Sequence, residues 1–156
     1  MNMATTRWLN DEEMRLWRAF LVVAMGVPAQ LDAQLKEVST LSLDDYEVLV
    51  HLSEADEQRV RMSELSAKLL HSRSRLTQRV DRLATRGLVR REKCTDDGRG
   101  TWAVLTDDGY TALRSAAPQH VEDVRANLFD HLHDDDVAAL MPVMERIAQA
   151  IETTRP

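Results

Sequence analysis

The order of local patterns between residues 59 and 105 constrains the fold of this chain more than any other feature. Ser63 can cap a short helix, and Ser72, after a brief turn, can cap a second helix that runs toward Arg86. Gly87 follows at the point where a helix end favours a residue that tolerates a left-handed backbone. The second helix repeats apolar residues at i, i+4 and i+7, which predicts one buried stripe: Leu76, Val80 and Leu83.

Two short strands are expected directly after this helix. They cover residues 88–93 and 101–105, and the residues between them, 95–100, are rich in the Asp and Gly of tight turns. A short helix, a turn, a longer helix and a β-hairpin together form a winged helix-turn-helix. The second helix of such a unit is sized for the major groove of DNA, and the hairpin tip for the backbone or minor groove.

The same segment holds most of the chain's concentrated positive charge. Between residues 59 and 93, eleven Lys or Arg stand against three acids, which leaves +8 in a chain whose net charge is −6. A basic block in an acidic protein is typical of a face that binds a polyanion, and double-stranded DNA is the partner we favour. One alternative is a merely solvated face. The other is a winged-helix interaction module whose basic face binds an acidic protein.

The candidate DNA contacts lie opposite the apolar stripe or at its edges. The helix is expected to present six side chains to the groove: Arg73, Ser74, Arg75, Thr77, Gln78 and Arg82. Arg79 and Arg86 lie nearer the flank, where they can serve packing or phosphates. Arg99, oriented by Asp97 at the hairpin tip, is expected to reach the minor groove or backbone. The caps Ser63 and Ser72 are expected to bring helix N-termini toward phosphates.

The stretch from Arg79 to Gly109 resembles the MarR (multiple antibiotic resistance regulator) family of bacterial transcription factors. Four pieces carry the resemblance: Val80-Asp81-Arg82-Leu83, Arg86-Gly87-Leu88-Val89-Arg90, the hairpin turn Asp97-Gly98-Arg99-Gly100, and Leu105-Thr106-Asp107-Asp108-Gly109. The resemblance implies a homodimer with interlocking terminal helices. It also implies a small aromatic or phenolic effector bound beside the DNA-binding lobe, for which the candidates are Trp17, Phe20, Tyr46 and His51. Aromatic residues at helical spacing are also common in cores, so that alternative stays open.

Both ends of the chain are expected to form long amphipathic helices. After the cap Asn10, apolar residues recur at spacings of three and four as far as Val38, with a bend near Pro28. The pattern resumes after Thr106, with a bend at Pro118, and continues in a last helix that begins near three acids, Asp134 to Asp136. These stripes exceed what the winged helix can bury, so a partner subunit is expected. We therefore expect one mainly α domain with a small β-wing. Residues 1–40 and 107–156 form its dimerisation helices, and residues 41–106 form the DNA-binding lobe.

Three other patterns favour structural interpretations. His131 and His133 precede the acids at 134–136, but these acids suit the start of a helix, so no metal or cofactor is expected. Cys94, near several cations, is read as an ordinary strand residue rather than a redox sensor. The longest apolar run has 11 residues, Ala19 to Ala29, whereas a membrane span needs about 20.

No catalytic motif is present, so we do not expect an enzyme. The sequence predicts a cytoplasmic, sequence-specific transcriptional regulator. The most specific form of this prediction is a ligand-responsive repressor that binds a palindromic operator as a homodimer.

Overall fold

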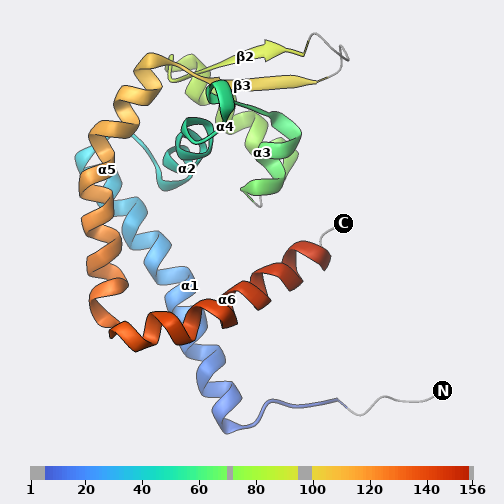
Figure 1. Cartoon of the computed structure of the whole chain (residues 1–156), viewed down its shortest axis with the longest axis vertical. Helices are drawn as coiled ribbons and strands as arrows, with labels where there is room; N and C mark the ends of the chain where they lie inside the picture. The colour runs from blue at the N-terminus through green and yellow to red at the C-terminus, as the bar shows by residue number, and fades with distance from the viewer. Residues whose placement is uncertain (1–5, 70–71, 95–99, 155–156) are drawn as a thin grey trace, which may run out of the picture.

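The computed structural model describes residues 6–69, 72–94 and 100–154 of the chain, which is mainly helical with one small sheet (Figure 1). The elements in chain order are α1 (Asp11–Val38), α2 (Leu43–Ser53), η1 (Asp56–Gln58), β1 (Arg59–Arg61), α3 (Met62–Lys68), α4 (Arg73–Thr85), β2 (Val89–Lys93), β3 (Thr101–Leu105), α5 (Asp107–Asn127), η2 (Phe129–His131) and α6 (Asp134–Thr154). The expected contacts of Asp97 and Arg99 lie outside the described residues. Within them, no helix is long and apolar enough to cross a membrane.

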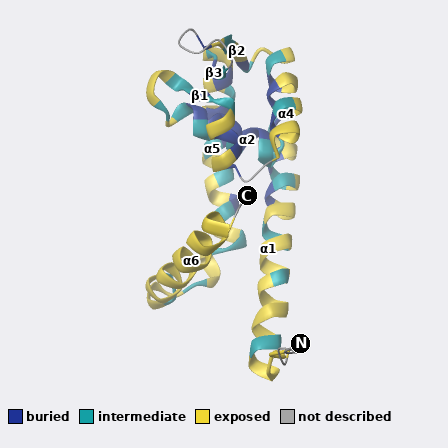
Figure 2. Cartoon of the chain, turned by 90° about the vertical axis from the view of Figure 1, so that its right-hand side faces the viewer, coloured by how far each residue is buried: buried dark blue, intermediate teal, exposed yellow. Residues whose placement is uncertain are grey.

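The hydrophobic core lies in the lobe formed by α2, α3, α4 and the sheet, closed by the end of α1 and the start of α5. Figure 2 shows the buried residues concentrated there. Leu76, Val80 and Leu83 of α4 are fully buried, which confirms the predicted stripe. The caps Asn10, Ser42 and Ser72 are also confirmed, because each side chain accepts a hydrogen bond from the backbone three residues later. These caps fix where α1, α2 and α4 begin.

The sheet has three antiparallel strands in the order β1-β3-β2, whereas the sequence predicted only the β2–β3 hairpin. The additional strand pairs Val60 with Ala103, and Val60 is buried. β1 runs directly into α3, whose first flanking residue is Arg61 and has no side-chain cap. The prediction that Ser63 caps this helix is therefore wrong. Because Arg61 pairs with Trp102, the residue that precedes α3 is Arg61, two positions before Ser63. Ser63 therefore lies inside the first turn of α3.

The junction between the hairpin and α5 is a close contact between two backbones. Gly87 ends α4 with φ +75°, and the Thr106 hydroxyl donates to its carbonyl at 2.7 Å. The same hydroxyl accepts from the backbone N–H of Gly109 at 3.0 Å, while the Thr106 N–H donates to the carbonyl of Leu88 at 3.2 Å. A Cβ at position 109 would lie only 2.0 Å from that Leu88 oxygen. Glycine is therefore required where α5 leaves the sheet.

The long terminal helices extend away from this lobe. Only Leu31 and Leu35 of α1 are buried, and α6 has no buried residue (Figure 2). Helix α5 continues through Pro118 without interruption. A proline frees the carbonyl four residues earlier, and Arg114 at that position is exposed, so water can satisfy the carbonyl. The apolar stripes of α1 and α6 remain largely uncovered in a single chain.

Candidate nucleic-acid interface

The outer face of α4 is polar and cationic, as the helical pattern predicts. Six of the candidate side chains for DNA contact are on this helix, and all but the half-buried Thr77 are exposed: Arg73, Ser74, Arg75, Gln78 and Arg82. Leu76, Val80 and Leu83 anchor the opposite face in the core. The helix is 13 residues long, which at 1.5 Å per residue is about 20 Å, enough to lie across a major groove.

The arginines of this region fall into two groups. Arg73, Arg75 and Arg82 form no ion pair with any residue that the structure describes. Arg79 instead donates to Asp45 Oδ1 at 3.1 Å and pairs with Asp44, and its side chain is only 15% exposed. Arg86 donates to the Thr40 hydroxyl at 2.7 Å and to Asp45 Oδ2 at 3.4 Å. The sequence placed Arg79 and Arg86 at the flank of the helix, and the structure shows that acids hold them there.

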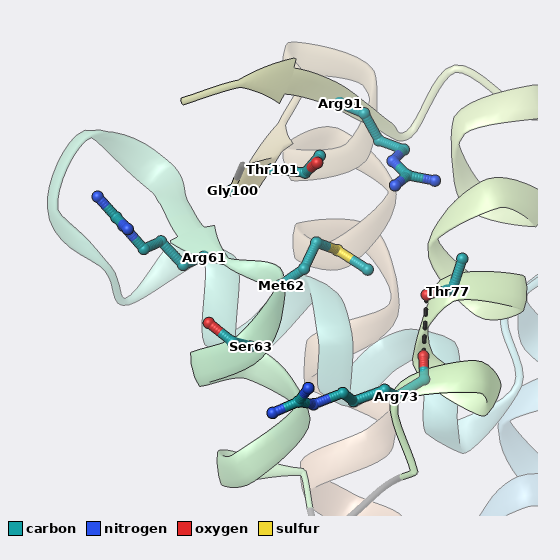
Figure 3. A pocket seen from close by; sticks show the side chains of 8 residues that line it. All are labelled: Arg61, Met62, Ser63, Arg73, Thr77, Arg91, Gly100 and Thr101. Atoms are coloured by element: carbon teal, nitrogen blue, oxygen red, sulfur yellow. Dashed lines mark hydrogen bonds between the residues drawn. The ribbon is translucent and has the colours of Figure 1, made fainter. Parts of the chain in front are cut away.

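A basic hollow of about 380 Å³ lies between α3, α4 and the hairpin (Figure 3). Arg73 and Arg91 border it from opposite sides, with the Met62 side chain between them. Arg91 also donates to Asp81 Oδ1 of α4 at 2.6 Å, which ties the hairpin to this helix. The described residues that line it are Arg61, Met62, Ser63, Arg73, Thr77, Arg91, Gly100 and Thr101. Guanidinium groups and hydroxyls around an apolar side chain suit a sugar-phosphate backbone.

Sequence patterns did not identify Arg61, Met62 or Arg91 as part of this surface. Arg61 depends on the unpredicted strand β1, which places it opposite Trp102 of β3. Its guanidinium carbon lies 5.2 Å from the Trp102 ring centroid, and that of Arg59 lies 5.0 Å from it. Cation–π contacts of this kind hold two cations beside the hollow.

The four effector candidates do not come together in the chain. Tyr46 and His51 line a pocket of about 500 Å³ that also includes Pro28 of α1 and His120 of α5. Trp17 and Phe20 instead stack on each other at 6.0 Å, 48% and 42% exposed, in the outer half of α1. Trp17 precedes Pro28 by about three helical turns, roughly 16 Å of helix, and Phe20 precedes it by about two turns, roughly 12 Å. The single chain therefore brings Tyr46 and His51 to one pocket, and Trp17 and Phe20 are not in its lining.

Two rings from different helices pack against each other in the lining of this pocket. The rings of Tyr46 (α2) and His120 (α5) lie 4.4 Å apart. Burial lowers the pKa of the His120 imidazole, against the opposing charge of Asp123, and burial raises the pKa of the Tyr46 phenol. His120 Nδ1 has no partner among the described residues. Both rings therefore stay neutral near pH 7, and both carry polar atoms suited to hydrogen bonding.

The residues considered for metal and redox chemistry have structural surroundings. Asp136 Oδ2 accepts from the backbone N–H of His133 at 2.8 Å, which is the helix-start role expected for the acids. Among the described residues, no group of three or more His, Cys, Asp or Glu is placed to hold a metal ion. Cys94 is buried just after β2, and its N–H donates to the carbonyl of Gly100 at 2.9 Å.

Comparison with known proteins identifies the family. Residues 39–100 match the model of the MarR family. The structure is similar over 96% of this chain and 100% of the other to AbsC, a MarR family transcriptional regulator from Streptomyces coelicolor, with 40% identity and a TM-score of 0.91. The chain belongs to the MarR family.

Two further relatives extend the comparison. Sco3205, a MarR family transcriptional regulator from Streptomyces coelicolor solved in complex with DNA, is 40% identical, with a TM-score of 0.90. The match covers 94% of this chain and 91% of that one. The transcriptional regulator PecS from Dickeya dadantii (strain 3937) is 27% identical over 93 residues. That match covers 60% of this chain and only 55% of PecS.

Proposed function

We propose that this MarR family member is a sequence-specific DNA-binding transcriptional repressor that acts as a homodimer in the cytoplasm. One observation carries the proposal. On the exposed face of α4, Arg73, Arg75 and Arg82 form no ion pair with a described residue, although the chain as a whole is acidic. The DNA complex of Sco3205, a relative that matches nearly the whole chain, supports the same function. This complex favours DNA binding over an interaction module that binds an acidic protein. It also favours a binding function over a catalytic one.

The recognition step follows from the arrangement around α4. With its buried stripe fixed in the core, α4 can enter a major groove and offer Arg75 and Gln78 to base edges. The basic hollow then lies against one strand of the backbone, where Arg73 and Arg91 contact phosphates and Met62 contacts a deoxyribose. From the hairpin tip Arg99, oriented by Asp97, extends the contact to the minor groove or backbone. Ser72, which caps α4, directs the start of that helix toward a phosphate.

A homodimer accounts for the uncovered helices. Large apolar side chains are exposed along α1 and α6, and exposed apolar patches of this kind mark interfaces. They are Leu16, Trp17, Phe20, Val22, Val23, Met25, Leu140, Met141, Val143, Met144, Ile147 and Ile151. A second copy supplies the same stripes about a two-fold axis. Two recognition helices related by that axis read a palindromic operator.

The pocket beside Tyr46 and His120 is the proposed effector site. It lies between α1, α2 and α5, where the dimer helices meet the DNA-binding lobe. The neutral rings of Tyr46 and His120, with His51 in the same lining, suit a small aromatic or phenolic ligand that also accepts or donates hydrogen bonds. An effector that prefers one spacing of the two lobes shifts the population able to bind DNA and releases the operator.

Selection of DNA from random pools tests the function directly. We expect a bipartite palindrome whose half-sites lie about one helical turn apart, bound with a steep dependence on salt. Inserting roughly five base pairs between the half-sites should abolish tight binding, because it rotates one half-site to the opposite side of the duplex. Recovery of no preferred sequence, with retention only of acidic proteins, would support the interaction module and contradict the proposal.

A further inference from the structure

Arg79 joins the proposed recognition helix to the first turn of α2. Its Nη1 donates to the Ser42 hydroxyl at 3.2 Å and to Asp45 Oδ1 at 3.1 Å, and its Nη2 pairs with Asp44. Both terminal nitrogens are thus engaged. Its Nε is buried and has no hydrogen-bond partner among the described residues, so the side chain is enclosed rather than presented to solvent. An arginine in this position has little freedom to reach a phosphate.

The acceptor side of this contact is equally fixed. Asp45 is only 9% exposed and is held by a reciprocal cap with Ser42, whose hydroxyl accepts from the Asp45 N–H at 3.1 Å. A second guanidinium, that of Arg86 at the C-terminal end of α4, reaches the other carboxylate oxygen of Asp45 at 3.4 Å. Two points on α4, two turns apart, are therefore tied to one buried acid of α2. Two such contacts restrict rotation of α4 more than a single contact would.

The same corner is connected to the dimerisation helix. Asp32 of α1 accepts from the backbone N–H of Leu43 at 2.9 Å and pairs with Lys36. The hydrogen bond from Lys36 is the main reason that the pKa of the Asp32 carboxyl is lowered, and the hydrogen bond from the Leu43 N–H is the second. Arg86 also donates to the Thr40 carbonyl, in the link between α1 and α2, at 3.0 Å. A continuous chain of polar contacts thus runs from α1 through the start of α2 to α4.

An open polar cleft of about 610 Å³ lies beside these contacts, between α1, α2 and α4. It shares Pro28 and Leu43 with the pocket of Tyr46 and His120. Because the cleft is not filled by apolar packing, the polar contacts make a large part of the connection between α1 and α4 on this side. Arg82 lines the cleft too, but it forms no ion pair with a described residue.

We propose that Arg79 and Arg86 are positioning residues for DNA recognition: held by Asp44 and Asp45, they set the orientation of α4 relative to α1 and thereby the half-site spacing that the dimer accepts. The inference rests on the proposed function, because it concerns the geometry of DNA binding by the dimer. It assigns these two arginines no contact with DNA. Arg82, on the same helix and close to Arg79, is assigned a phosphate contact instead.

The test compares Arg79→Ala with Arg82→Ala on two operators, the one selected from random pools and a copy with one base pair inserted between its half-sites. For each variant, the affinity ratio between the two operators and the salt dependence on the better one are measured. Arg82→Ala should weaken both operators in parallel and reduce the salt slope by about one unit per subunit. Arg79→Ala should keep the salt slope and lower the affinity ratio by roughly fivefold, at the lower end of ordinary coupling between sites.

A second set of variants separates positioning from folding. Asp44 is half-exposed, so Asp44→Asn weakens the same contact with less disturbance of the core, and it should lower the affinity ratio in the same direction. Arg79→Lys should restore part of the ratio, because one cation can still reach the acids. All assays are run where circular dichroism shows each variant to be folded.

The possible results separate failure of the positioning role from failure of the proposed DNA-binding function. An Arg79→Ala variant that loses one unit of salt slope with an unchanged affinity ratio would make Arg79 a phosphate contact. A folded Arg79→Ala variant with both quantities unchanged would make the contact purely structural. Either result overturns the inference and leaves the proposed function in place. Failure to select any operator would overturn the function, and the inference with it.

Discussion

Replacing Gly109 by Ala should destabilise the protein, although alanine is the better helix former. The added Cβ would lie 2.0 Å from the carbonyl oxygen of Leu88 and 2.9 Å from Leu105 Cδ1, whereas such contacts are essentially never shorter than 3.0 Å. The start of α5 must therefore move by about 1 Å away from the sheet, and overpacking of this kind costs about 1–3 kcal/mol. The movement also breaks the hydrogen bond from the Thr106 N–H to the Leu88 carbonyl, which contributes about 1 kcal/mol.

The gain from helix propensity is about 1 kcal/mol, so the net loss of stability should be about 1–3 kcal/mol. Urea unfolding followed by circular dichroism measures it, at one protein concentration because assembly shifts apparent stability. Gly26→Ala is the matched control, since a Cβ there meets nothing within 4 Å and only the propensity gain applies. Each kcal/mol should change Tm by about 2–4 °C. Equal stability of the Gly109→Ala and Gly26→Ala variants would refute the close-contact argument.

Four further predictions follow from the same structure. Arg75→Ala or Gln78→Ala should cost about 1–3 kcal/mol on the selected operator and relax preference at particular base positions, as read by binding to single-base operator variants. Deletion of residues 134–156 should turn a dimer into aggregates or poorly folded monomer in sedimentation experiments; a stable monomer of unchanged Tm would contradict the proposed dimer. Because burial lowers the pKa of His120, stability should fall as pH drops below its ordinary value of 6.5, and His120→Phe should reduce this slope in urea unfolding. Small aromatic carboxylates or phenols should raise Tm and weaken DNA binding; compounds that do neither would remove the pocket of Tyr46 and His51 from the proposal.

The parts of the fold that the sequence predicts are those determined by local repetition. The α4 stripe, its cap Ser72 and the exposed Arg75 and Gln78 follow from helical periodicity and a capping residue, and the structure places all of them as expected. The hairpin was predictable because turn residues separate its two strands. Strand β1 was not, since three residues are too few to show a period, and the erroneous cap at Ser63 resulted from that omission.

The functional assignments that the sequence could not make all depend on contacts between distant residues. Asp45 and Arg79 are 34 positions apart, and no local pattern indicates that one will neutralise the other. Their pairing separates Arg79 from the arginines of α4 that form no ion pair with a described residue, a division that charge counting misses. Trp17 and Tyr46 are both aromatic and lie on consecutive helices, which is the only relation that the sequence shows between them. The length of α1 separates them, since only its second half reaches the core.

The placement of acids explains how a chain with net charge −6 can present a surface for DNA. Acids occupy the first turns of α1, α2, α5 and α6, where they stabilise the helix ends, and none lies in the first turn of α4. Three acids at α4 are paired with an arginine: Asp44 and Asp45 of α2 with Arg79, and Asp81 of α4 itself with Arg91. Charges farther away than the Debye length, about 8 Å at physiological ionic strength, are largely screened. A polyanion at α4 therefore experiences mainly Arg73, Arg75 and Arg82, which form no ion pair with a described residue. As salt is lowered and the screening length grows, repulsion from the distant acids should offset part of the gain in affinity, so that the salt dependence flattens at the lowest ionic strengths.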